Sequence, residues 1–182
     1  MKKLMVTIAL LGLLILTPAH ALASMIMTLY VVDVEKMNTI ETDGAQRHAL
    51  LSETNRARVL DLEKTWNGID FLLTRTDNDK NNPRSWVIFG RKDVGEDLGY
   101  GPARLLSPSD VKEIAMLLKE ETPEKLALEY DPKLMDKQGI YPQIWVRDGQ
   151  EALSWLLGYY KQLVVFYGNA AKNGQGVLIV LL

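Results

Sequence analysis

Four acidic side chains are the residues of this sequence best suited to catalysis. Asp70, Glu96, Asp97 and Asp131 fall in or beside expected loops and helix ends. Two carboxyl groups held about 5–9.5 Å apart across a cleft hydrolyse glycosidic bonds, so a carboxylate-dependent hydrolase acting on cell-wall sugar is one alternative for the function. Acidic residues at such places more often cap helices and anchor loops, and we favour that interpretation.

Nucleophilic and zinc-dependent mechanisms lack the residues they need. The 182-residue sequence has no cysteine and only two histidines, His20 and His48. A zinc site needs several converging His, Cys or carboxylate ligands, and a catalytic triad would depend on His48. No Gly-x-Ser-x-Gly motif is present. His48 is therefore expected to be a surface residue, and the residue inventory favours a protein that is not an enzyme.

Calcium and phosphate sites also lack their motifs. Asp77-Asn-Asp79 has the oxygen-rich character of a calcium loop, but Asn82 and Ile88 stand where an EF-hand has its sixth-position Gly and twelfth-position Glu. The glycines between Gly95 and Gly101 are not followed by the Gly-Lys-Ser/Thr of a phosphate-binding loop. We expect neither a metal ion nor a cofactor.

The segment Asp97–Arg104, with the sequence DLGYGPAR, is the most distinctive candidate for a binding loop. Gly99 and Gly101 permit backbone angles that are closed to other residues, and Pro102 fixes its own φ. The loop is therefore expected to have a single shape, which would carry its tyrosine and arginine.

Large amphipathic side chains gather in the predicted loops and helix starts. Tyr, Trp and Arg commonly anchor protein interfaces. The predicted interface joins five such residues to two acidic neighbours: Tyr100, Arg104, Asp97, Trp66, Asp70, Tyr141 and Trp145. Burial in the core is the alternative for Trp66, Tyr141 and Trp145, and an ion pair with Asp97 or another acid is the alternative for Arg104.

The first residues have the pattern of a cleaved secretory signal. Two lysines precede an apolar run over residues 6–16, a Thr-Pro pair ends the run, and small residues follow at Ala19, Ala21 and Ala23. Cleavage after Ala21 or after Ala23 fits equally well. The run is shorter than the ~20 residues that span a bilayer, and a chain without cysteine has no site for a lipoprotein anchor. We therefore expect residues 1–23 to be a signal peptide and the protein to be periplasmic or secreted.

The net charge argues against nucleic acids and anionic membranes as partners. The net charge is −2, from 21 Lys and Arg against 23 Asp and Glu. Removal of Lys2 and Lys3 with the signal lowers the basic count from 21 to 19 and makes the net charge −4. Nucleic acids and anionic membranes attract basic surfaces, so neither is the expected partner.

Apolar runs predict strands at 25–32, 86–89 and 176–182. Leu62, Trp66, Ile69 and Leu73 recur with helical spacing after Asp61, which stands at the expected N-cap. Asp33 is able to cap a short helix, and residues 40–55 are expected to form a loose helix or two. Ser107, Thr122 and Asp131, each followed by proline, predict three further helix starts. A long helix is expected from Asp148 to Asn173. Residues 75–84 and 91–97 are expected to be a polar loop and a charged turn.

Strands at both ends and in the middle, with helices between them, predict an α+β fold. No linker divides the chain, so residues 24–182 are expected to form a single compact domain. Its sheet is expected to be small, mostly antiparallel or mixed, and packed by several helices.

Four segments together resemble the YfbM-like family, the bacterial domain of unknown function numbered 1877. They are Leu60–Thr74, Asp97–Arg104, Met135–Pro142 and Gly174–Val180. The resemblance covers nearly all of the mature chain and implies a compact single-domain α+β fold, without any activity. Family members typically begin near the first strand, whereas this chain has an expected export signal ahead of it.

The leading hypothesis is an exported, non-catalytic protein-binding domain. A specific form is an inhibitor or immunity protein that neutralises a secreted toxin or effector in the periplasm. A small-ligand-binding or structural domain, with a closed apolar pocket near Tyr100, is a second alternative beside the hydrolase.

Overall fold

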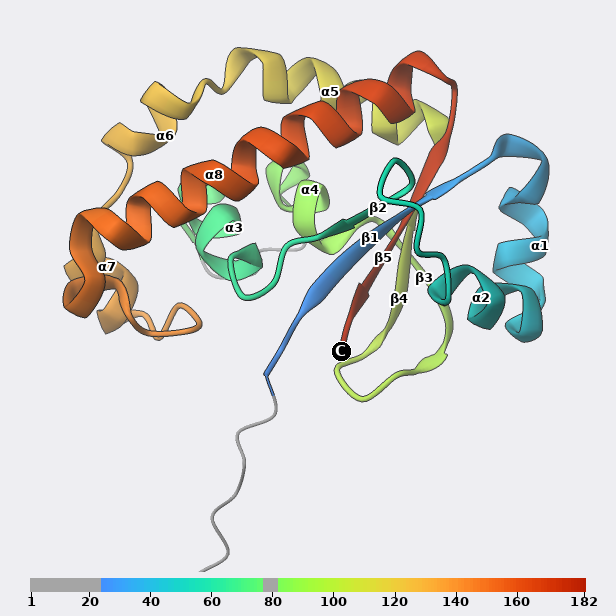
Figure 1. Ribbon diagram of the computed structural model, residues 1–182, viewed down its shortest axis with the longest axis horizontal. Helices are drawn as coiled ribbons and strands as arrows, with labels where there is room; N and C mark the ends of the chain where they lie inside the picture. Colours follow the sequence, from blue (N-terminus) through green and yellow to red (C-terminus); the bar gives the residue numbers. More distant parts are fainter. Residues whose placement is uncertain (1–23, 77–81) are drawn as a thin grey trace, which may run out of the picture.

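One five-stranded antiparallel sheet forms the centre of the molecule (Figure 1). The structure is a computed structural model, and it describes residues 24–76 and 82–182. Across the sheet the strands lie in the order β2, β1, β5, β4, β3. Their bounds are Met27–Val32 for β1, Val59–Asp61 for β2, Lys92–Asp97 for β3, Pro102–Leu106 for β4 and Gly176–Leu181 for β5. The α+β prediction is confirmed.

The central pair, β1 and β5, is buried on both faces. Leu29 pairs with Ile179, and both side chains belong to the larger apolar cluster. Tyr30 pairs with Leu178, and both belong to a smaller cluster on the opposite face. Because successive residues of a strand point to opposite faces, a continuous apolar run requires cover on both sides.

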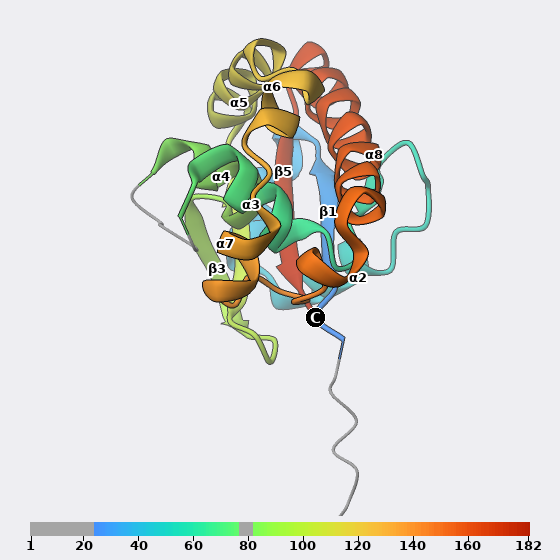
Figure 2. The same cartoon turned by 90° about the vertical axis from the view of Figure 1, so that its left-hand side faces the viewer.

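Helices supply that cover unequally. The larger layer lies on one face of the sheet (Figure 2) and contains α3 Trp66–Thr74, α4 Trp86–Phe89, α5 Pro108–Glu120, α6 Pro123–Leu128, α7 Pro132–Lys137 and α8 Trp145–Lys172. The opposite face is covered by α1 Met37–Thr42 and α2 Gly44–Leu51. No helix among the described residues is both long and apolar enough to cross a membrane.

Side-chain caps set the starts of α5, α6 and α7 in the larger layer, as the sequence predicts. Ser107 Oγ accepts a hydrogen bond from Asp110 N at 3.2 Å, and the Asp110 carboxylate accepts one from Ser107 N at 2.9 Å, which completes a capping box. The side chains of Thr122 and Asp131 cap α6 and α7 by accepting hydrogen bonds from Lys125 N and Leu134 N, without the reciprocal bond of a capping box, and each is followed by proline. The short helices are therefore set by residues within a few positions of their ends.

The expected strand at 86–89 is wrong, because these residues form α4. A short apolar run does not by itself distinguish a strand from a buried helical turn. Here Asn82 caps a 3₁₀ turn, η2 Pro83–Ser85, which leads directly into the helix. The expected charged turn is also wrong, since β3 occupies it as an edge strand, where charged residues are common.

Asp61 does not cap α3. It ends β2 and accepts a hydrogen bond from Glu63 N at 2.6 Å, and the helix begins only at Trp66. Asp33 does not cap the following 3₁₀ turn, η1 Val34–Lys36, with its side chain either. Its carboxylate instead forms an ion pair with Arg58 at 2.8 Å.

Candidate functional site

The loop between β3 and β4 has the fixed shape that its sequence predicts. The Asp97 carboxylate accepts hydrogen bonds from Gly99 N at 2.7 Å and Gly101 N at 3.0 Å. Leu98 N donates to Gly101 O at 3.0 Å. Gly99 and Gly101 have φ values of +115° and +104°, a region that strongly favours glycine. Asp97 therefore closes the loop and presents Tyr100 at its tip.

These bonds predict a pH dependence. Donation from Gly99 N and Gly101 N lowers the pKa of Asp97 below its ordinary value. A carboxyl group with a lowered folded-state pKa stabilises the fold above its unfolded pKa of about 3.9 and loses this contribution as the pH falls through the folded value. We expect NMR titration to place the pKa of Asp97 below that reference.

The Asp97→Asn variant is the matched control, since an amide oxygen still accepts both hydrogen bonds but does not titrate. Below pH ~4, the unfolding free energy of wild type should fall more steeply than that of the variant. Parallel curves for the two proteins would show that Asp97 makes no such contribution.

Side chains from the β3–β4 hairpin and from β1, α3, α4 and β5 enclose a hollow of about 160 Å³ beside this loop. The hairpin loop that lines the hollow lies at the same end of the sheet as the C-terminus (Figure 1). Tyr100 and Arg104 line it from the hairpin, Trp66 from α3, Phe89 from α4 and Leu181 from β5. Three residues of the predicted interface, separated by up to 38 positions in the sequence, therefore meet at one place.

Aromatic packing fixes the wall formed by Trp66. Its ring stacks on Tyr141 with centroids 5.8 Å apart and meets the edge of Phe89 at 5.8 Å. Its Nε1 donates a hydrogen bond to Met25 O at 3.2 Å. Tyr141 is held in turn by its own N–H, which donates to Asn67 Oδ1 at 2.8 Å. The wall is thus rigid before anything binds, which reduces the entropy lost on binding.

Arg104 is held by an acid on the neighbouring strand. Asp93 lies directly opposite Arg104 in the β3–β4 register, and its Oδ1 is 2.7 Å from Arg104 Nε. The arginine is mostly buried, whereas 61% of the Asp93 side chain is exposed. A Cβ at Gly90, where φ is +60°, would lie 2.6 Å from Arg104 Cβ. Glycine at this position therefore lets the end of α4 approach the strand that carries Arg104.

Three residues of the predicted interface are buried in the core, and Trp66 is one of them, with 6% of its surface exposed. Trp145 is fully buried, and its Nε1 donates to Ile140 O at 2.7 Å. Asp70 is fully buried on α3 and accepts a hydrogen bond from Ser85 Oγ at 2.8 Å. Neither Trp145 nor Asp70 reaches a surface at which a partner could touch it, so the core alternative holds for Trp145 and the interface prediction for Asp70 is corrected.

The acids proposed for catalysis have separate surroundings. Asp70 is in the core, Asp97 closes the hairpin loop and Asp131 caps α7 through Leu134 N at 3.0 Å. Glu96 lines a hollow on the other side of β3, together with His48 of α2. The pairing of carboxylates across one cleft that glycoside hydrolysis needs finds no support in this arrangement.

Within the described ranges, no group of three or more His, Cys, Asp or Glu residues is arranged to hold a metal ion. His48 is exposed on α2. The weak calcium-loop segment Asp77–Asp79 lies outside the described residues.

Residues 23–180 match the model of a family described as "Domain of unknown function (DUF1877)". The chain belongs to this family. Its fold is similar to that of "a Protein of Unknown Function YfbM from Escherichia coli", a crystal structure with a TM-score of 0.72 and 23% sequence identity. The likeness covers 87% of this chain and 100% of the other. None of the curated proteins matches the chain.

Sequence reasoning missed Phe89 as part of the hollow and Asp93 as the partner of Arg104. Phe89 was assigned to a strand, so its contact with Trp66 was not expected. The partner of Arg104 was left open between Asp97 and another acid, because the choice depends on strand register. An aspartate and an arginine on the two sides of the glycine loop were the available signal, but the sequence does not reveal which residues stand opposite each other.

Proposed function

We propose that this protein is a non-catalytic binding domain that docks another protein on its glycine-loop surface. This surface is defined by Trp66, Phe89, Tyr100, Arg104 and Tyr141. The observation that carries the proposal is the convergence of Trp66, Tyr100 and Arg104 around one hollow. Trp, Tyr and Arg are the residues most enriched among interface hot spots.

The size of the hollow favours a protein side chain over a metabolite. Pockets for small molecules usually measure about 300–1,000 Å³, whereas this hollow has about 160 Å³. That space suits one apolar side chain inserted between Trp66 and Tyr100. Tyr100 is 45% exposed at the rim, so its ring is available to cover the inserted group.

The charges near the hollow indicate which charge the partner should carry next to its inserted apolar side chain. Asp93 and Asp97 place two carboxylates on the hairpin that carries Arg104. The Asp93 side chain is largely exposed although it pairs with Arg104. A partner with a Lys or Arg next to its apolar anchor would complement this balance.

Export defines the specific form of the proposal. If residues 1–23 act as the secretory signal that their pattern predicts, the partner is met in the periplasm or outside the cell. A secreted toxin or wall-degrading effector, neutralised by an inhibitor or immunity protein, is then the partner to be sought.

The test is affinity capture with residues 24–182 against secreted and periplasmic proteins of its own source. Wild type is compared with Tyr100→Ala and Arg104→Ala. A Leu128→Ala variant is the control, since Leu128 is an 85% exposed apolar residue on α6, away from the hollow. We expect wild type and the control to retain one protein, and Tyr100→Ala to bind it about 30-fold more weakly, as for a hot-spot residue.

Folding is checked for each variant by chemical unfolding. Removal of an exposed side chain such as Tyr100 should change the unfolding free energy by no more than about 0.5 kcal/mol. Capture that is equal in all variants would move the interface elsewhere, and capture by none would argue against the binding function.

A further inference from the structure

A second and larger concavity lies on the opposite flank of the molecule, away from the glycine-loop surface. It is bounded by α8 and by the segment 52–58, which joins α2 to β2 and projects along the outer side of α8 (Figure 2). We call it the α8 groove. Its volume is about 430 Å³, and its floor is apolar, since Val31, Leu60 and Phe166 are all buried there.

One stripe of α8 forms a wall of the groove. Lys161, Val165 and Asn169 of α8 and Asn173 at its C-cap recur every four residues and all line it, because residues four apart share a helix face. At about 1.5 Å per residue the stripe is roughly 18 Å long. The groove is therefore elongated, with a cation near one end and carboxamides near the other.

All the charged side chains that line the groove are positive. Arg56 and Lys161 contribute two positive charges, and none of the described residues that line the groove is acidic. Throughout the described ranges, neither cation lies within 4.0 Å of a carboxylate oxygen. Lys161 does interact electrostatically with Glu124. The pKa of Glu124 is lowered mainly by hydrogen bonds from its own backbone and from Thr122, and to a smaller extent by the charge of Lys161.

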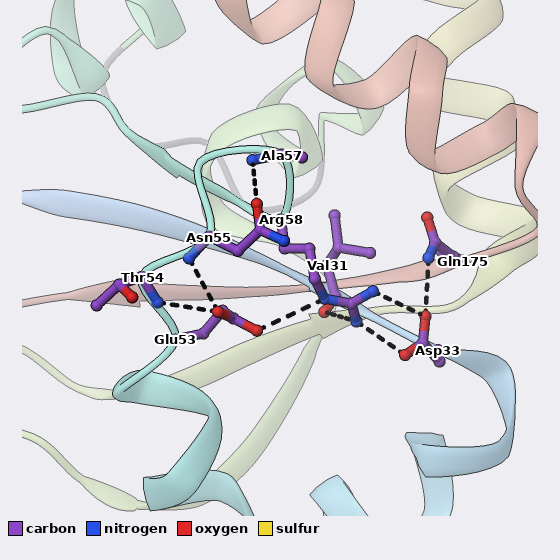
Figure 3. Close-up of polar contacts among 8 residues, drawn as sticks. All are labelled: Val31, Asp33, Glu53, Thr54, Asn55, Ala57, Arg58 and Gln175. Carbon is purple, nitrogen blue, oxygen red and sulfur yellow. Dashed lines mark hydrogen bonds and ion pairs between the residues drawn. The ribbon is translucent and has the colours of Figure 1, made fainter.

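A polar network holds the wall opposite α8 in place (Figure 3). Arg58 donates to both oxygens of Asp33, at 3.2 and 2.8 Å, and Gln175 Nε2 donates to the same carboxylate at 2.8 Å. The hydrogen bond from Arg58 is the main cause that lowers the pKa of Asp33. Arg58 is thereby neutralised, so its charge serves the loop and not a ligand.

The projecting segment is also bonded within itself. Glu53 Oε1 accepts from Thr54 N at 3.0 Å and Asn55 N at 2.9 Å. Asn55 Oδ1 accepts from Ala57 N at 3.0 Å. Because the segment is organised by its own side chains, Arg56 is presented at the groove without help from a ligand.

We propose that the α8 groove binds a small amphipathic anion, with a carboxylate or phosphate group on an apolar body. The anionic group lies against Arg56 or Lys161, and the apolar body covers the floor formed by Phe166, Leu60 and Val31. The side-chain amides of Gln162, Asn169 and Gln175 provide hydrogen bonds to polar atoms between the two ends. The volume lies within the range of about 300–1,000 Å³ found for small-molecule sites.

The test uses decanoate, decyl phosphate and decyltrimethylammonium as probes of full-length mature protein, residues 24–182, followed by NMR chemical shifts and calorimetry. At least one anion should bind with a dissociation constant on the order of 1 mM or lower, given the usual ligand efficiencies. Shifts should concentrate in segment 52–58 and in α8 from residue 161 onward. The two anions distinguish a carboxylate site from a phosphate site, and the cation should bind at least about tenfold more weakly.

Three variants assign the contacts. Arg56→Glu and Lys161→Glu each reverse one groove charge, and Val165→Glu places an acid at the rim on a residue that is 62% exposed. Lys133→Glu on α7, an exposed lysine outside the groove, is the matched control. We expect Val165→Glu and at least one of Arg56→Glu and Lys161→Glu to weaken anion binding at least about tenfold. The control variant should bind as wild type does.

Binding of the cation as tightly as the anions would overturn the proposal, as would shifts outside the groove or no saturable binding by either anion. None of these results bears on Tyr100 and Arg104. Failure at the α8 groove and failure of the protein-binding proposal are therefore separate outcomes.

Discussion

The Trp145→Ala variant should lose about 3–5 kcal/mol of unfolding free energy, as large-to-small changes of buried aromatics do. Trp145 is fully buried at the start of α8, and its Nε1 donates to Ile140 O at 2.7 Å. Its removal leaves a cavity where α7 meets α8 and takes away one of the two hydrogen bonds that Ile140 O accepts, since Gln143 N also donates to it at 2.9 Å. Domains are commonly stable by only about 5–15 kcal/mol, so the loss is a large fraction of the total.

Urea unfolding followed by circular dichroism measures this loss, with Val146→Ala as the control. Val146 is the next residue along and is mostly exposed, so its truncation should change stability by no more than about 0.5 kcal/mol. A Trp145→Ala variant as stable as this control would place Trp145 at the surface, which is the interface position that its sequence allows.

The Gly68→Ala variant should lose about 2–3 kcal/mol, because there is no room for one more methyl group. A Cβ at Gly68 would lie 2.6 Å from Trp145 Cη2 and 2.8 Å from Leu156 Cδ2. Both neighbours are fully buried and cannot swing into solvent. The intrinsic helix preference for alanine over glycine, about 1 kcal/mol, is too small to offset this overpacking.

Gly158→Ala is the matched control, since Gly158 is an exposed position of α8 with nothing within 4 Å of the added Cβ. That variant should gain about 0.5–1 kcal/mol. In a double variant, Trp145→Phe should recover part of the Gly68→Ala loss, because phenylalanine lacks the Cη2 atom that clashes. A loss equal to the sum of the single variants would show that the two sites do not touch.

The contact between Gly68 and Trp145 shows how much of the packing of α3 could be predicted from its local sequence. The spacing of Trp66, Ile69 and Leu73 predicts a helix with one buried face. In the structure every residue from Trp66 to Leu73 is buried, because the helix is enclosed by the sheet, α4, α6 and α8. Gly68 and Asp70 stand on faces that the pattern treats as exposed, so neither the tight contact with Trp145 nor the burial of Asp70 was expected.

The glycine-loop surface was more accessible to prediction than the α8 groove. The shape of its loop depends on Asp97, Gly99 and Gly101, which lie within five positions of one another. The α8 groove has no comparable local signal. It brings the stripe of Lys161 and Asn169 beside segment 52–58, more than a hundred residues earlier in the chain.

Elements whose signals are local could be predicted from the sequence alone. The capped starts at Ser107, Thr122 and Asp131, the two-sided burial of the first and last strands and the closed glycine loop all depend on interactions within a few residues or on apolar pattern. Tertiary structure decided which distant side chains meet. The pairing of Arg104 with Asp93 depends on strand register, and the burial of Asp70 and Trp145 on helix packing. Both depend on the free energy of the whole core and not on any one segment.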